Sequence, residues 1–183
     1  MNLKLKQGLI AVFLLCFFLP SLCLAAAMPR EVQEKGHPVK LGDEVKNHLS
    51  FFTWPMRITP DGLNYCWRDR KNYTSPELIL RTKKGKNAIW CIEIDRIPGI
   101  TTPEGIGIGS TKEAIEVQYG KSQGYTDVNG DLIMAYGGRN RKDYYMRFRL
   151  SGRKEKTVVY MTIGDPSVGE PQSKMKTKKK KRR

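Results

Sequence analysis

The fold of this chain is constrained most strongly by a pattern of turns and apolar residues that occurs twice, over residues 39–94 and 106–163. Each copy begins with a glycine-containing turn and a polar residue suited to cap a helix, Asp43 in the first and Ser110 in the second. Glu113 completes a capping box behind Ser110, and Gly120 can end that helix. Each copy then continues with three short runs of alternating apolar residues, which is the pattern of antiparallel strands. Few residues are identical between the copies, so the repeat rests on spacing and turn chemistry.

This repeat predicts an α+β fold. We expect two tandem modules, each a helix followed by three antiparallel strands, which form a shared sheet with the helices on one face. The expected strands are residues 63–67, 77–82 and 88–94 in the first module, and residues 132–136, 144–150 and 158–163 in the second.

The first 27 residues have the pattern of a Sec signal peptide. Lys4 and Lys6 precede an apolar run over residues 8–24, and the alanines at 25–27 provide a cleavage site before Met28. A retained membrane anchor is the alternative, but the apolar run is short and polar sequence follows at once. We therefore expect an exported protein, periplasmic or secreted, with attachment to a surface as a further option.

The charge of the chain is concentrated at its C-terminus. The chain has 33 Lys and Arg residues against 18 Asp and Glu, a formal net charge of +15, and eight of the basic residues lie in 174–183. Such a run of like charge repels itself and favours disorder. The expected organisation is a signal peptide over 1–27, a leader segment over 28–38, modules over 39–97 and 98–163, and a disordered linker with a polybasic tail over 164–183.

The mature chain would keep two cysteines, Cys66 and Cys91. Export favours a disulfide between them, and both fall on one predicted sheet face. In a simple three-strand meander, however, the first and third strands lie ~9.6 Å apart, whereas a disulfide needs Cα atoms within ~7 Å. Three alternatives stay open: a strand order other than the simple meander, a bulge that closes the gap, or free thiols.

No group of residues in the sequence indicates catalysis or metal binding. The histidines are His37 and His48, which are too few for a zinc site and lie in no Ser/His or Cys/His signature. The glycines Gly105, Gly107 and Gly109 lack the spacing of a phosphate-binding loop. We expect a protein that is not an enzyme and that uses no cofactor or metal.

One phrase of the second copy resembles a known group of exported modules. The phrase runs from Gly105 to Glu113 and leads to a Tyr119-Gly120 pair, so that a turn of small residues precedes a short amphipathic helix. In this and in its element order, the chain resembles the tandem modules of the β-lactamase-inhibitor-protein fold and the single module of BamE (SmpA/OmlA-like) envelope proteins. The resemblance implies a saddle-shaped sheet whose open face binds a protein.

Alternation along the strands predicts which side chains lie on that open face. It places Met134, Met146 and Phe148 on the buried face and Ile89 on the open one. A tyrosine and two arginines share one side of the strand at 144–150, and a second tyrosine joins them from the next strand. Tyrosine and arginine are enriched among the residues that dominate binding energy at protein interfaces. The expected partner-binding residues are Tyr145, Arg147, Arg149, Tyr160, Arg68 and Arg81.

Two functions fit these features. The first is an exported, non-enzymatic binding protein that holds a protein partner, of unknown identity, on the open sheet face. The alternative is an envelope-associated protein that binds a polyanion, an anionic membrane or a wall polymer, through its basic tail and surface arginines. No specific nucleic acid partner is expected. The tail residues assigned to this alternative are Lys178, Lys179, Lys180, Lys181, Arg182 and Arg183.

Overall fold

The computed structural model describes residues 27–51, 57–59, 62–68, 77–138 and 143–169; for residues 49–68, Thr126 and Val128 it describes the backbone alone. Within these ranges the chain is mostly β-sheet, with one α-helix and one 3-10 helix. No helix in this part of the chain is long and apolar enough to cross a membrane.

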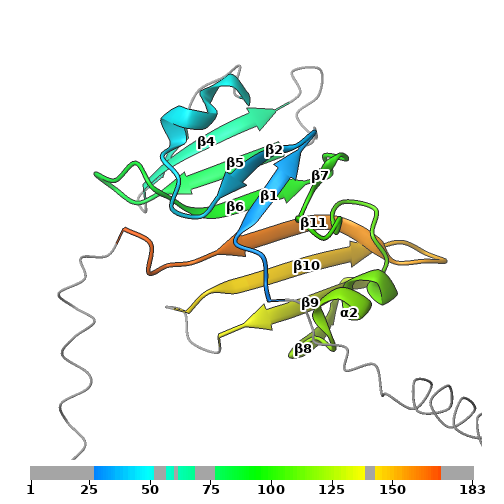
Figure 1. The fold of residues 1–183 in the computed structure, drawn as a ribbon. Coiled ribbons are helices and arrows are strands. Elements are labelled where there is room, and N and C mark those ends of the chain that lie inside the picture. Colours follow the sequence, from blue (N-terminus) through cyan, green and yellow to red (C-terminus); the bar gives the residue numbers. More distant parts are fainter. Residues whose placement is uncertain (1–26, 52–56, 60–61, 69–76, 139–142, 170–183) are drawn as a thin grey trace, which may run out of the picture.

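An eight-stranded antiparallel sheet forms the body of the molecule (Figure 1). Its first four strands come from the first half of the chain and its last four from the second half, and β6 pairs with β11 at the junction. In spatial order the strands are β3 (Arg57–Thr59), β4 (Gly62–Arg68), β5 (Glu77–Thr82), β6 (Ile89–Asp95), β11 (Thr157–Gly164), β10 (Tyr145–Ser151), β9 (Asp131–Gly137) and β8 (Gly124–Val128).

The predicted α+β class is wrong, because the described chain is mostly β-sheet and a second antiparallel sheet forms part of the layer that was expected to be helical. This sheet has the order β2 (His37–Lys40), β1 (Glu31–Glu34) and β7 (Ile100–Thr101). The first helix segment is the 3-10 helix η1 (Val45–Phe51). Its expected cap, Asp43, instead accepts hydrogen bonds from the Lys40 backbone amide at 3.0 Å and from the His48 ring at 3.1 Å, and so closes a turn.

The α-helix of the second half was predicted correctly except for its cap. Helix α2 (Lys112–Tyr119) is capped by Thr111, whose hydroxyl accepts a hydrogen bond from the Ala114 amide at 3.2 Å. The expected cap, Ser110, accepts from the Gly107 amide at 3.0 Å and so stabilises the preceding turn. The helix ends at Gly120, as predicted.

The hairpin of β1 and β2 occupies the segment that was expected to be a leader. Lys35 and Gly36 join the two strands with φ angles of 49° and 81°, as a type I′ turn requires. Val32 and Val39 lie opposite each other in this hairpin and are buried in the core. Each strand therefore contributes one buried residue to the fold.

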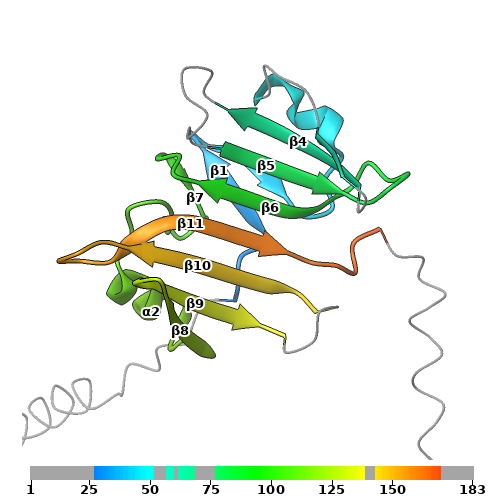
Figure 2. The same ribbon diagram turned by 180° about the vertical axis from the view of Figure 1, so that it is seen from behind.

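The core lies between one face of the large sheet and a layer made of the small sheet and α2 (Figure 1). In the second half, an aromatic cluster joins α2 to the sheet. The ring centroids of Tyr119, Tyr136 and Phe148 lie 6.1–6.3 Å apart, and the Tyr136 hydroxyl donates to the Gly120 carbonyl at 3.0 Å. Figure 2 shows the other face of β6, β11 and β10, with no helix in front of it.

Strand alternation predicted the buried side correctly except near two bulges. Met134, Met146 and Phe148 are buried, as predicted. In β6 the register shifts opposite Arg81 and Thr82, and this shift turns Ile89 inward, although it was expected to face outward. A second register shift occurs in the β10–β11 pair beside the predicted site. Arg149 pairs with Tyr160 but Leu150 pairs with Val158, so that Val158 is buried and Val159 is the extra residue of the bulge.

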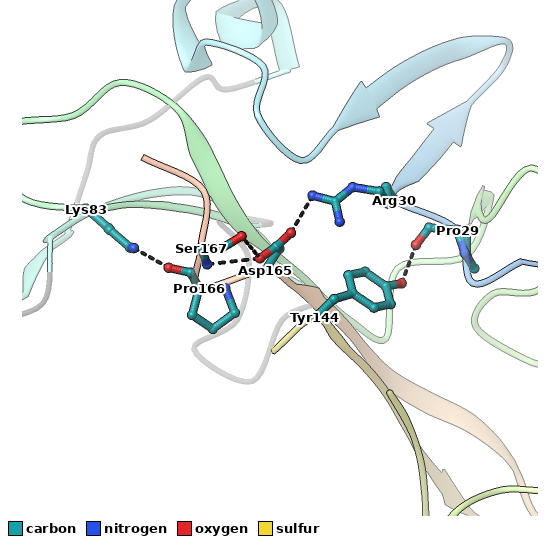
Figure 3. Close-up of polar contacts among 7 residues, drawn as sticks. All are labelled: Pro29, Arg30, Lys83, Tyr144, Asp165, Pro166 and Ser167. Carbon is teal, nitrogen blue, oxygen red and sulfur yellow. Dashed lines mark hydrogen bonds and ion pairs between the residues drawn. The ribbon is translucent and has the colours of Figure 1, made fainter. Parts of the chain in front are cut away.

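Contacts between the two ends of the described chain close the fold (Figure 3). Arg30, just before β1, pairs at 2.5 Å with Asp165, just after β11, and the side chain of Asp165 is buried. Asp165 also accepts hydrogen bonds from the amide and hydroxyl of Ser167. The Tyr144 hydroxyl donates to the Pro29 carbonyl. Residue 30 is thus tied to the end of β11, and residue 29 to the start of β10.

Candidate binding site on the open sheet face

The predicted partner-binding residues of the second half lie next to one another on β10 and β11. Along β10 the side chains alternate between buried and accessible, so that Tyr145, Arg147 and Arg149 lie on the face away from the core. Tyr160 of β11 is the register partner of Arg149. The four side chains therefore form one cluster, which we call the Tyr/Arg cluster.

A glycine on β11 makes room for the ring of Tyr145. Gly164 is the register partner of Tyr145, and a Cβ atom on Gly164 would lie 2.5–2.7 Å from three atoms of that side chain. The ring therefore lies across the glycine and covers the sheet behind it. There the Tyr145 hydroxyl lies 3.6 Å from Sγ of Cys91. Burial raises the pKa of Tyr145, so the phenol stays protonated at neutral pH.

Each arginine of the cluster stacks on a tyrosine. The guanidinium carbon of Arg147 lies 5.1 Å from the ring centroid of Tyr145, and that of Arg149 lies 5.5 Å from the ring centroid of Tyr160. Both distances are within the range of a cation–π interaction. Stacking holds the two guanidinium groups against the sheet face while both arginines remain exposed.

The arginines of this face differ in their acidic partners. Arg81 on β5 makes a two-pronged ion pair with Glu93, and this hydrogen bonding raises its pKa. Arg149 lies 3.9 Å from Asp95 and 3.8 Å from Asp131, both longer than a hydrogen bond.

No carboxylate of the described residues lies within ion-pair distance of Arg147. The positive charge of Arg147 is therefore balanced by no acid in this part of the chain.

A shallow pocket of about 400 Å³ opens between the members of the cluster. Its walls combine the two stacked arginine–tyrosine pairs with apolar and hydroxyl groups from neighbouring strands. The lining residues are Glu93, Ile133, Tyr145, Arg147, Phe148, Arg149, Tyr160 and Thr162. All four residues of the Tyr/Arg cluster line this pocket.

The remaining predicted residues lie elsewhere. Arg81 shares the open face, but β6 and β11 separate its strand from β10, and Glu93 occupies its guanidinium group. Arg68 lies on β4 opposite Glu77, one strand further away, and its side chain is outside the described residues. The tail residues 178–183 are outside them as well.

The cysteine pair is not formed in the structure. Cys91 is a free thiol, buried beneath Tyr145 and 3.5 Å from the Thr162 hydroxyl. Its strand, β6, is separated from that of Cys66 by β5, so the strand order is the simple meander that keeps the backbones ~9.6 Å apart. Burial raises the pKa of the Cys91 thiol to about 11. Free thiols were one of the three alternatives that the sequence left open.

Among the residues of the site that were not predicted, three lie on the neighbouring strands β11 and β6. Gly164 and Thr162 of β11 are the register partners of Tyr145 and Arg147, and Glu93 of β6 pairs with Thr162 in turn. None has a local sequence signal, because their roles follow from which strands are neighbours. In the described ranges, no group of three His, Cys, Asp or Glu side chains could hold a metal ion.

Comparison with known proteins identifies no family for this chain. No family model matches it, and no curated protein matches it. A solved structure that it resembles is a DUF4309 family protein (YjgB) from Bacillus subtilis subsp. subtilis str. 168. The likeness has a TM-score of 0.39 and 16% sequence identity, and it covers 67% of this chain and 78% of that chain. A likeness at this level carries no inference about function.

Proposed function

We propose that this chain is an exported, non-enzymatic binding protein that holds a protein partner on the open face of its large sheet. The observation that carries the proposal is the pair of stacks, Arg147 on Tyr145 and Arg149 on Tyr160, around a pocket open to solvent. Arginine and tyrosine provide large contact areas with polar ends and dominate many protein interfaces. Stacking also restricts both arginines before a partner arrives, which lowers the entropy cost of binding.

The protonation states of the site favour binding over catalysis. Burial, together with the neighbouring Glu93 carboxylate, raises the pKa of Tyr160, and burial also raises that of Tyr145. The Cys91 thiol, with a pKa of about 11, remains protonated at neutral pH and is therefore a poor nucleophile. The two protonated tyrosine hydroxyls can act as hydrogen-bond donors, and neither they nor the buried Cys91 thiol is poised to accept a proton or to attack a substrate.

Photo-cross-linking in cells tests the proposal. A photoreactive p-benzoylphenylalanine at Ile133, which lines the pocket, should capture a discrete partner, and the additional substitution Arg147→Ala should lower its yield. The matched control is the same photoreactive residue at Val117, which is 72% exposed on α2, the helix that packs on the core side of the sheet (Figure 1). Equal capture from both positions, or a yield unaffected by Arg147→Ala, would count against the open face.

A second function, polyanion binding, is favoured by a different observation. Lys83, at the end of β5, donates a hydrogen bond to the Pro166 carbonyl (Figure 3), and the Lys86 side chain lies beside Gly169. The basic turn between β5 and β6, which also holds the exposed Lys84, therefore lies where the chain leads into its basic tail. Basic groups near an anionic membrane contribute about 1 kcal/mol each.

Vesicle sedimentation tests this second function. Residues 28–183 should bind vesicles of phosphatidylglycerol and phosphatidylcholine at low salt and be released as salt is raised. Deletion of residues 174–183 should abolish that binding, and Lys84→Gln should weaken it, while both variants keep the cross-link formed from Ile133. If the tail deletion also abolished the cross-link, the polyanion function would replace the protein-binding one.

A further inference from the structure

The charges around the pocket indicate what kind of segment it accepts. Of the acidic side chains near the cluster, Glu93 is held by Arg81, and Asp95 and Asp131 approach Arg149 at distances longer than a hydrogen bond. Arg147 has no acidic neighbour within 4 Å among the described residues. The pocket therefore presents two guanidinium groups whose N–H donors no carboxylate of the described chain holds at hydrogen-bond distance.

The two guanidinium groups are also held in a fixed arrangement. Tyr145 supports Arg147 and is itself held across Gly164, while Tyr160 supports Arg149. A stacked guanidinium keeps its planar edge free to bind a carboxylate with two parallel hydrogen bonds.

The spacing of the two arginines matches that of an extended peptide. Arg147 and Arg149 are two residues apart on β10, and alternate residues of a strand are about 6.6–6.8 Å apart. In an extended segment, acidic side chains at alternate positions have the same spacing. One carboxylate could then bind at each guanidinium, with the residue between them facing away from the sheet.

We infer that the partner presents an extended acidic segment, with Asp or Glu at alternate positions, whose carboxylates bind Arg147 and Arg149 in the pocket between Tyr145 and Tyr160. This inference rests on the proposed protein-binding function and specifies the chemistry of the partner. Charge complementarity is its basis, since the pocket is lined by two arginines and by one carboxylate, Glu93, which Arg81 holds. Such a lining with aromatic walls favours carboxylates over cationic segments.

Peptide titration monitored by NMR tests the inference on residues 28–183. The probes are an acetylated Gly-Glu-Gly-Glu-Gly peptide, its Gln counterpart and inorganic phosphate, each at physiological salt. The Glu peptide should shift the amide signals of β10 and β11. The Gln peptide should bind about two- to tenfold more weakly, since it loses two charge pairs with exposed arginines, each of modest strength.

Variants locate the binding site. Arg147→Gln should weaken binding of the Glu peptide about two- to fivefold, whereas Arg153→Gln, in the exposed turn between β10 and β11, should leave binding unchanged. The signal dispersion of each variant reports whether it is folded. Equal binding of the Glu and Gln peptides, no shift with either, or an unaffected Arg147→Gln variant overturns the inference.

Two further outcomes separate this inference from the proposed function. Phosphate that binds the same residues more tightly than the Glu peptide would assign the pocket to phosphate groups and overturn the acidic-segment inference. If the cross-link from Ile133 joins a partner through a segment without acidic residues, the inference fails while the protein-binding function stands.

Discussion

At the scale of single residues, the candidate site depends on a glycine, because only a residue without a side chain leaves room for the tyrosine ring. Gly164 leaves the space that the Tyr145 ring occupies, and the ring in turn covers Cys91, which is 1% exposed. The alternating tyrosine and arginines of β10 are the part of the site that the sequence pattern predicts. The glycine beneath it is identified only when the neighbouring strand and its register are known.

Gly164→Ala should displace the Tyr145 ring, because the new Cβ atom would lie 2.5–2.7 Å from three of its atoms. We expect a loss of about 1–3 kcal/mol in the free energy of unfolding, as for other overpacked positions. The Cys91 thiol should also react faster with a thiol reagent. Urea denaturation and the modification rate, both measured in a Cys66→Ser background, check these two effects.

Gly124→Ala is the matched control, since a Cβ atom on Gly124, in the edge strand β8, would meet nothing within 4 Å. It should change neither the unfolding midpoint nor the thiol reactivity. An unchanged midpoint and a protected thiol in Gly164→Ala would mean that Tyr145 does not lie across the glycine.

At the scale of elements, the aromatic cluster determines how α2 packs on the sheet. Tyr136→Ala should lower the free energy of unfolding by about 3–5 kcal/mol, because it removes a buried ring packed between Tyr119 and Phe148. Tyr136→Phe should cost about 0.5–1.5 kcal/mol, since it loses the hydrogen bond to the Gly120 carbonyl. Chemical denaturation measures both effects.

Val117→Ala provides the comparison on the exposed side of α2, where a change within ±0.5 kcal/mol is expected. If Tyr136→Ala were as mild as this surface change, β9 would not contribute the buried face that the structure gives it.

The elements that were predicted well are those with enough length to show a period. Strand β5 (Glu77–Thr82) alternates over six residues and was predicted with the same bounds. Strands β1 and β2 have four residues each, with one buried valine apiece, and so short a segment shows no period. The Lys35-Gly36 turn was their available signal, since both residues adopt positive φ.

At the scale of the whole molecule, the layer that covers the large sheet depends on pairing between strands far apart in the sequence, which the sequence pattern did not predict. The predicted strands of the two halves do meet in one sheet, through β6 and β11, but the layer that covers it is largely a second sheet. In that layer residues 33–34 pair with residues 100–101, although four strands of the large sheet lie between them in the sequence. No local pattern encodes such a pairing, so a helical layer was expected in its place.

The contact between the two ends of the described chain, Arg30 with Asp165, also belongs to the scale of the whole molecule. Burial alone would raise the pKa of Asp165, but hydrogen bonds from Ser167 and Arg30 outweigh it and lower the pKa below its ordinary value of 3.8. The carboxylate therefore stabilises the fold fully above that ordinary value, and this contribution is lost as the pH falls through the folded-state pKa. The contact should make stability dependent on pH in the acidic range.

Asp165→Asn tests this dependence, because it keeps the shape of the side chain and removes its charge. In residues 28–183 we expect it to lower the free energy of unfolding by about 1.5–3 kcal/mol at pH 7, and the difference from the unmodified chain should shrink toward pH 3. Urea denaturation across this range measures it. Asp127→Asn, at an exposed pair with Lys156, should cost at most about 1 kcal/mol.

The difference in the free energy of unfolding between Asp165→Asn and the unmodified chain could stay constant from pH 7 to pH 3. The charge of Asp165 would then contribute nothing to stability. If the difference instead shrinks toward pH 3, and Arg30→Ala also lowers the free energy of unfolding by part of the same amount, the residues just after the expected cleavage site belong to the folded unit. In that case the chain reaches its full stability only when β11 is complete and residues 29–30 have docked against its end, because Arg30 and Asp165 lie at opposite ends of the described sequence.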